Sequence, residues 1–200
     1  MHATCRNFVR PLTLLALLSA TAPVFAHPGH DAASLASGLS HPIGGLDHLL
    51  AMLAVGLFGA SLGGRAVWAL PAAFVSAMVA GFSLSLSGMV LPFVEPVILA
   101  SVVALGLVVA MAMPVSAGWG MALAGFFALF HGNAHGAEIG MAGILPYAAG
   151  FAIATAFLHA SGAALGLGLQ RQAGDRAGRV AMRAAGGATM LGGLALAFAG

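Results

Sequence analysis

The sequence contains no lysine and very little charge of either sign. Only 6% of its 200 residues are charged, whereas 60% are hydrophobic. A soluble domain typically carries about a quarter charged residues, so this chain cannot cover itself with a water-compatible surface. Because apolar runs fill nearly its whole length, the chain is expected to be a multi-pass membrane protein.

Cysteine and clustered basic residues are also scarce. The single cysteine is Cys5, so disulfides and thiolate metal sites are excluded from the rest of the chain. All seven basic residues are arginines, and two of them, Arg6 and Arg10, lie near the N-terminus. The other five are balanced by five acidic residues. Since nucleic-acid binding depends on clustered basic side chains, no nucleic-acid partner is expected.

Residues 1–26 have the pattern of a cleaved signal peptide. Two arginines precede a short apolar run over residues 12–20, and the segment ends in Val24-Phe25-Ala26, with small side chains at the positions a signal peptidase reads. The apolar run is shorter than the roughly 20 residues that a spanning helix needs. An uncleaved first helix remains the alternative. The predicted organisation is a signal peptide (1–26), a periplasmic histidine-containing tail (27–41) and a transmembrane domain (42–200).

Six apolar stretches make up the predicted transmembrane domain. Each is long enough to span a bilayer at about 1.5 Å per residue, and backbone groups in lipid must bond within their own segment. The expected fold class is therefore an all-α membrane protein, a bundle of six transmembrane helices. Glycines four residues apart would let these helices approach closely. The stretches cover residues 42–62, 66–87, 94–113, 117–139, 142–168 and 180–199, and the glycines are Gly132, Gly136, Gly140, Gly162 and Gly166.

The arginines indicate the orientation. Signal cleavage leaves the new N-terminus, near His27, on the periplasmic side of a bacterial inner membrane. Six crossings then place the 62–66 turn and the 169–179 loop in the cytoplasm, together with the C-terminus in the periplasm. The cytoplasmic segments carry Arg65, Arg171, Arg176 and Arg179. This distribution agrees with the positive-inside rule.

Ionisable side chains within two of the stretches carry the main functional signal, because such groups are costly inside a bilayer. The sequence FHGNAHGAE covers residues 130–138. It spaces His131, His135 and Glu138 at i, i+4 and i+7, which is one stripe on a helix. Imidazole and carboxylate donors of this kind suit a borderline divalent ion such as nickel, cobalt or zinc.

A second polar group opens the first stretch, in the sequence HPIGGLDH over residues 41–48. Pro42 suits the first turn of a helix, which places His41 at the helix mouth. Asp47 and His48 would follow one to two turns inside, with His48 on nearly the same face as His41. In the predicted topology both polar groups lie near the periplasmic side. One shared metal site is therefore predicted, with the ligands His41, Asp47, His48, His131, His135 and Glu138.

The remaining histidines leave two interpretations open. His159, in the 142–168 stretch, makes either an interhelical hydrogen bond or a second station on an ion path. His27 and His30 either capture metal or belong incidentally to a flexible tail. The methionines after residue 26 are scattered, which argues against a copper(I) pathway.

The two motifs, HPIGGLDH at 41–48 and FHGNAHGAE at 130–138, together resemble the HupE/UreJ family. The resemblance spans essentially the whole chain, and the run from Thr155 to Gly162 is also similar to the family's pattern. The resemblance implies a membrane protein that supplies nickel or cobalt, often alongside nickel–iron hydrogenase, urease or cobalamin synthesis. Metalloenzyme-maturation proteins are then expected partners, besides the metal ion and lipid.

The resulting hypothesis is secondary transport of Ni²⁺ or Co²⁺ from periplasm to cytoplasm by ligand exchange. The metal is the cargo, and no tightly bound cofactor and no enzymatic activity are expected. The sequence has no P-loop, so energy would come from an ion gradient or a partner subunit. Because neutral imidazole is the binding form, uptake is expected to weaken as the external pH falls through about 6.5.

Two other functions compete with transport. An intramembrane metal hydrolase would hold zinc with His131 and His135, but Gly132 stands where the His-Glu-x-x-His pattern has its general base. A metal sensor or chaperone would bind the ion without moving it. Uptake by vesicles that contain only this protein separates transport from both.

Overall fold

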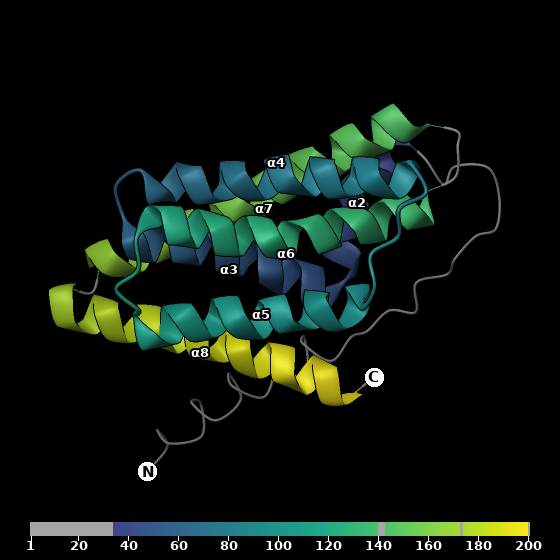
Figure 1. The fold of residues 1–200 in the computed structure, drawn as a ribbon. Coiled ribbons are helices and arrows are strands. Elements are labelled where there is room, and N and C mark those ends of the chain that lie inside the picture. The colour runs from purple at the N-terminus through teal and green to yellow at the C-terminus, as the bar shows by residue number, and fades with distance from the viewer. Residues whose placement is uncertain (1–33, 140–142, 173, 200) are drawn as a thin grey trace, which may run out of the picture. The chain divides into compact units, whose positions relative to one another are not determined.

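The computed structural model describes residues 34–139, 143–172 and 174–199, which form seven α-helices and no strand (Figure 1). This confirms the all-α class. The predicted signal peptide and the histidines His27 and His30 lie outside the described residues. The helices are α2 (Leu35–Gly44), α3 (Leu46–Leu62), α4 (Ala66–Leu86), α5 (Val94–Met111), α6 (Ala117–Glu138), α7 (Ile144–Gln172) and α8 (Gly174–Ala199).

Four of the described helices, α4, α5, α7 and α8, are long and apolar enough to cross a membrane. The bent pair α2 and α3 makes a fifth candidate if the two are counted as one span. The helix α6 has 22 residues, but its two histidines, its asparagine and its glutamate lower its hydropathy. The described helices thus support a multi-pass membrane protein. A sixth crossing by α6, signal cleavage and periplasmic termini stay predictions.

The first predicted stretch is two helices that meet at an angle of 86°. The helix α2 starts after Ser34, whose side chain accepts a hydrogen bond from the Ser37 amide in a capping box. Pro42 lies inside α2, near its C-terminal end, so its predicted place in a first turn is wrong. Proline lacks the amide that would bond to the Gly38 carbonyl. The helix ends at Gly44, and Gly45 is extended (φ −99°, ψ 120°).

Because of this break, His41 and His48 lie on two different helices. His41 lies near the end of α2, and His48 lies in the first turn of α3. The prediction that both occupy nearly the same face of one helix is therefore wrong. Residues 35–41, which the sequence assigns to the tail, are helical.

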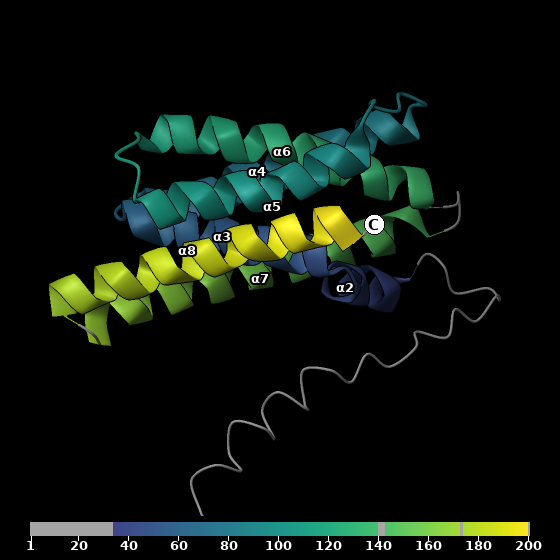
Figure 2. The same ribbon diagram turned by 90° about the horizontal axis from the view of Figure 1, so that it is seen from below.

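The helices pack in pairs, with α4 along α6, α5 along α8, and α7 along both α2 and α3 (Figures 1 and 2). Glycines allow the closest approaches. Gly132 of α6 lies against the Met78 carbonyl of α4, and Gly162 of α7 lies against the Leu53 carbonyl of α3. A Cβ atom at either glycine would overlap the carbonyl oxygen. Both contacts confirm the predicted small-residue faces.

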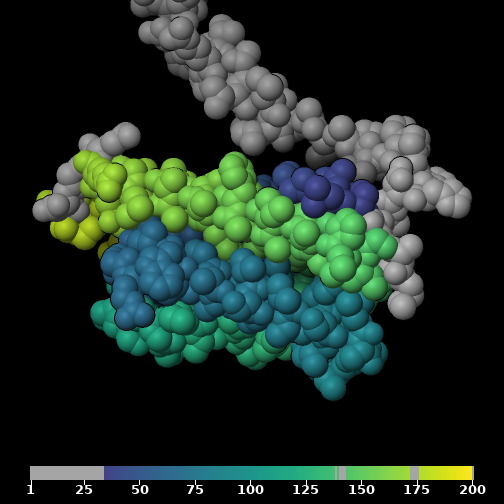
Figure 3. All heavy atoms as spheres, turned by 90° about the horizontal axis from the view of Figure 1, so that it is seen from above, coloured from purple at the N-terminus to yellow at the C-terminus, as the bar shows by residue number. Residues whose placement is uncertain are grey.

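The central helix is α3, which contacts each of the other six described helices. All its residues from Ala54 to Ala60 are buried. Phe58 of this helix and Phe74 of α4 are among the largest fully buried side chains. The short helix α2 packs on the N-terminal part of α7 at one end of the bundle (Figure 3). In the first turn of α3, His48 is buried by its neighbours, whereas Asp47 is partly exposed.

Candidate metal centre

Four of the predicted ligands meet at this end of the bundle, and we call them the histidine cluster: His41 on α2, His48 on α3, and His131 and His135 on α6. The ring centroid of His135 lies 4.5 Å from that of His41 and 4.6 Å from that of His48. The rings of His48 and His131 are 4.9 Å apart. Three members are almost inaccessible, with exposures of 9% for His48, 0% for His131 and 1% for His135. The break at Gly45 permits this arrangement, because it lets α2 turn toward α6 and α7.

The ring of His48 is oriented by its neighbour in sequence. Asp47 Oδ1 lies 2.9 Å from His48 Nδ1 and also accepts a hydrogen bond of 2.8 Å from the His48 amide. A carboxylate can only accept, so Nδ1 carries the proton and Nε2 keeps its lone pair. His48 Nε2 is buried and has no hydrogen-bond partner among the described residues. A carboxylate behind an imidazole in this manner is the usual support of a metal-binding histidine.

The ring of His131 is fixed in a similar way from α5. Ser101 Oγ donates its proton to the Ile98 carbonyl over 2.6 Å and lies 3.0 Å from His131 Nε2. Since the single hydroxyl proton is used, Ser101 accepts from Nε2–H, and the lone pair of His131 lies on Nδ1. In the described part of the chain, this buried Nδ1 has no hydrogen-bond partner. His48 and His131 thus each offer one unprotonated nitrogen.

Aromatic side chains enclose the histidine cluster. The Phe151 ring of α7 lies 4.2 Å from the His135 ring, and Tyr147 of the same helix lies 5.9 Å from His41. Phe74 of α4 covers the other side, 5.5 Å from His131. These rings exclude water, which strengthens electrostatic interactions with a bound ion.

The cluster rings meet largely edge to face, at interplanar angles between 59° and 86° for the three closest pairs. In this arrangement no three His, Asp or Glu side chains of the described residues present their donors to one common point. Coordination of an ion therefore requires the rings to rotate. Glu138 ends α6 on the expected stripe, but its side chain lies outside the described residues.

One more buried histidine, His159, lies outside the histidine cluster. His159 of α7 is fully buried, and its ring lies 4.9 Å from that of Phe74. Phe74 therefore contacts both His131 and His159. The structure does not join His159 directly to the histidine cluster by a ring contact within the described residues.

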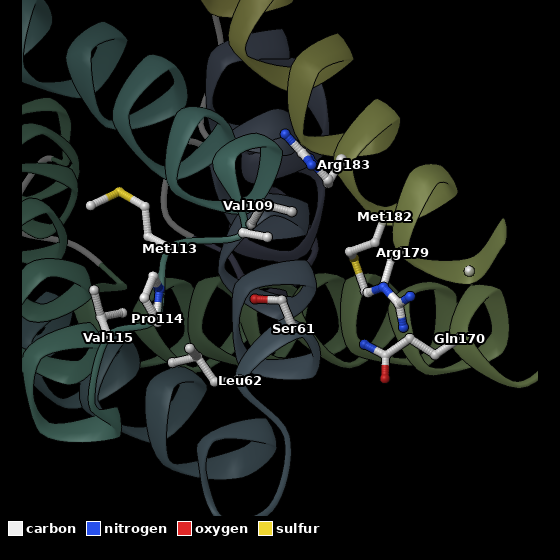
Figure 4. Close-up of a pocket in the computed structure, with 12 residues that line it drawn as sticks. Ser61, Leu62, Val109, Met113, Pro114, Val115, Gln170, Arg179, Met182 and Arg183 are labelled. Carbon is white, nitrogen blue, oxygen red and sulfur yellow. The ribbon is translucent and has the colours of Figure 1, made fainter. Parts of the chain in front are cut away.

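A cavity of about 500 Å³ lies at the opposite end of the bundle, between the C-terminal ends of α3 and α5 and parts of α7 and α8 (Figure 4). Its polar lining includes Ser61, Gln170, Arg179 and Arg183. Two guanidinium groups make this cavity electrostatically unfavourable for a divalent cation. It is not a candidate metal site.

Sequence reasoning missed Ser101 and Phe74, and it assigned no role to Asn133. Asn133 accepts a hydrogen bond from the Leu91 amide and donates one to the Met89 carbonyl, both over 2.8 Å. It thereby ties the connection between α4 and α5 to the helix that carries two cluster histidines. Apart from Glu95 in its first turn, Ser101 is the one polar side chain of α5, a signal that could have marked it.

Comparison with known proteins decides the family. The model of the HupE / UreJ protein family matches residues 15–196. The chain belongs to the HupE/UreJ family. A curated HupE/UreJ relative, Protein HupE of Rhizobium leguminosarum bv. viciae, is 44% identical over 185 residues, which cover 92% of this chain and 95% of the relative. No solved structure matches the chain.

Proposed function

We propose that this protein is a secondary transporter that carries Ni²⁺ or Co²⁺ from the periplasm to the cytoplasm and supplies metalloenzyme maturation. The observation that carries the proposal is the meeting of four histidines from three helices in an enclosed interior. Membership of a family associated with nickel and cobalt supply supports the choice of cargo. Imidazole nitrogen is a favoured donor for both ions.

Each cluster residue has a role in this proposal. His41, the half-buried member, first binds the hydrated ion. The ion then exchanges its water ligands for His48 Nε2, His131 Nδ1 and the His135 ring. Asp47 holds the His48 ring and offsets the charge of the ion. Glu138, one turn beyond His135 on α6, adds a carboxylate. His27 and His30 are proposed to capture the ion first.

The packing of Gly132 disfavours the competing hydrolase. A metal hydrolase of the His-Glu-x-x-His type needs a glutamate at this position to activate water. Gly132 lies against the Met78 carbonyl of α4, where even a Cβ atom would overlap. A general base therefore cannot be accommodated at position 132. Transport or simple binding remains, and uptake measurements separate these two.

The proposal is tested by radioactive nickel uptake, with cobalt competition, into vesicles that contain only the purified protein. Wild type is compared with His135→Ala and Glu138→Ala, and Gln170→Ala at the opposite end serves as the polar control. We expect uptake to fall to background in the first two variants, because a buried ion loses a ligand or a compensating charge. Uptake by Gln170→Ala should match wild type.

Binding is measured on the same preparations by calorimetry. Wild type that binds nickel without taking it up would refute transport and favour a sensor or chaperone. Normal uptake by both His135→Ala and Glu138→Ala would place the route elsewhere in the protein.

A further inference from the structure

His159 is a buried polar side chain whose bonding the fold leaves unexplained. It is 0% exposed, and neither Nδ1 nor Nε2 has a hydrogen-bond partner within the described residues. Buried imidazoles in proteins normally bond to a carbonyl, a hydroxyl or water. Of its two predicted roles, the interhelical hydrogen bond is therefore absent from the described structure.

The surroundings of His159 supply further donor atoms. Thr155 lies one turn earlier on α7 and is fully buried, and its hydroxyl lies 3.8 Å from the thioether sulfur of Met78 on α4. Nitrogen, oxygen and sulfur donors in one region suit a borderline divalent ion. Such a site is weaker than one made of several imidazoles, which favours release over retention.

Phe74 contacts both this region and the histidine cluster. Its ring centroid is 5.5 Å from that of His131 and 4.9 Å from that of His159, and the side chain is fully buried. Phe74 and Met78 are one turn apart on α4, as Thr155 and His159 are on α7. The Phe74 ring, in contact with both histidines, is therefore placed to obstruct an ion that moves from His131 to His159.

We propose that His159 is a second metal-binding station in the middle of the bundle and that Phe74 is the barrier between it and the histidine cluster. The inference rests on the proposed transport function, because it divides the route into two steps. The ion binds at the cluster, the Phe74 side chain changes rotamer, and His159 takes the ion up. The closed ring keeps the two stations separate at rest.

The ligand role is tested by replacing His159 with Leu and with Cys. His159→Leu should lower nickel uptake about tenfold or more, while calorimetric nickel affinity at the histidine cluster is unchanged. His159→Cys restores a metal ligand and should recover part of the uptake. Cys5 is the single cysteine of the wild-type sequence, so a thiolate-to-cobalt absorption band that this variant shows and wild type does not would report metal at position 159.

The barrier is tested by Phe74→Leu, with Phe58→Leu as the matched control. Phe58 is also a fully buried phenylalanine, and it contacts no histidine ring in the described structure. Phe74→Leu should raise the initial uptake rate by about threefold to tenfold at unchanged cluster affinity. Phe58→Leu should leave the rate unchanged, because it removes the same volume away from the route.

The outcomes separate this inference from the transport proposal. Uptake by wild type together with full uptake by His159→Leu would overturn the second station and leave transport intact. Equal effects of Phe74→Leu and Phe58→Leu on the uptake rate would overturn the barrier role of Phe74. Equal loss of uptake in His159→Leu and His159→Cys, without a thiolate band, would show that His159 is a packing residue and not a ligand. Absence of uptake by wild type would overturn both proposals.

Discussion

The two ends of the bundle both carry nitrogen-rich side chains but place them in opposite environments. At the histidine cluster, His48, His131 and His135 are buried. At the other end, which we call the arginine end, Arg65, Arg171, Arg176, Arg179 and Arg183 are exposed. Arg183 Nε donates to the Ala110 carbonyl over 2.8 Å, and Gln170 Nε2 donates to the Ala60 carbonyl over 3.0 Å.

The two ends differ in whether their polar side chains form hydrogen bonds within the described structure. Carbonyls near helix C-termini lack partners within the helix, and the arginine end provides them for α5 and α3. Its charges also agree with the predicted cytoplasmic side under the positive-inside rule, so the arginine end needs no metal to account for it. The histidine cluster does the reverse, since it leaves buried nitrogens of His48 and His131 without partners in the described structure. Such unpartnered buried groups call for an explanation, and the metal binding that we propose would provide one.

The largest effect that would sharpen this comparison is expected from Asp47→Ala. Loss of the carboxylate frees the His48 ring and removes a negative charge beside the ion. Nickel affinity measured by calorimetry should fall about 10–100-fold. Asp47→Asn retains an oxygen acceptor, so its nickel affinity should fall less.

Glu95→Ala is the matched control, because both acids lie in the first turn of a helix, α3 for Asp47 and α5 for Glu95. Both changes remove the same favourable interaction with a helix N-terminus. Glu95 is exposed and contacts no cluster histidine. A comparable loss of affinity in the two variants would show that Asp47 acts through the helix and not through His48.

A smaller effect is expected from Ser101→Ala. This variant removes the acceptor that holds His131 Nε2–H and so favours Nδ1 as the metal donor. One hydrogen bond contributes about 1 kcal/mol, which corresponds to an approximately fivefold loss of nickel affinity. Ser61→Ala is the control at the arginine end, since Ser61 Oγ also donates to a carbonyl three residues earlier. Unchanged affinity in Ser101→Ala would contradict the role assigned to this serine.

The sequence predicted the bounds of three helices closely, but it failed at the first stretch and at the predicted 169–179 loop, where α7 continues to Gln172 and α8 already starts at Gly174. Hydrophobic length gave 66–87, 94–113 and 117–139, and the observed helices α4, α5 and α6 have similar bounds. The error at residues 41–48 arose from Pro42, whose preference for a first turn is a local rule. The Ser34 capping box starts a helix seven residues before Pro42 and is a local signal that the prediction did not use. The packing of α2 on α7, which local spacing does not encode, holds the helix that continues through that proline.

The arrangement of the candidate site was predictable to a similar degree. A helical period places His131 and His135 on one stripe, and the cost of burying such groups marks them as candidate functional residues. Which helices are neighbours cannot be read from period or composition. Ser101 is 30 residues from His131 in sequence, and Phe74 contacts histidines on two other helices. These partners follow from packing alone.

The smallest effect is expected at the arginine end, from Arg183→Ala. The variant loses the hydrogen bond to the Ala110 carbonyl, which at an exposed position should cost about 1 kcal/mol and lower Tm by about 2–4 °C. Arg176→Ala is the control, since Arg176 is exposed on the same helix and its side chain makes no hydrogen bond to another described residue. Nickel uptake by both variants should equal that of wild type, because neither contacts the histidine cluster. If Arg183→Ala lowers uptake as much as Ser101→Ala does, the two ends are functionally coupled and their division into a stabilising and a metal-binding end fails.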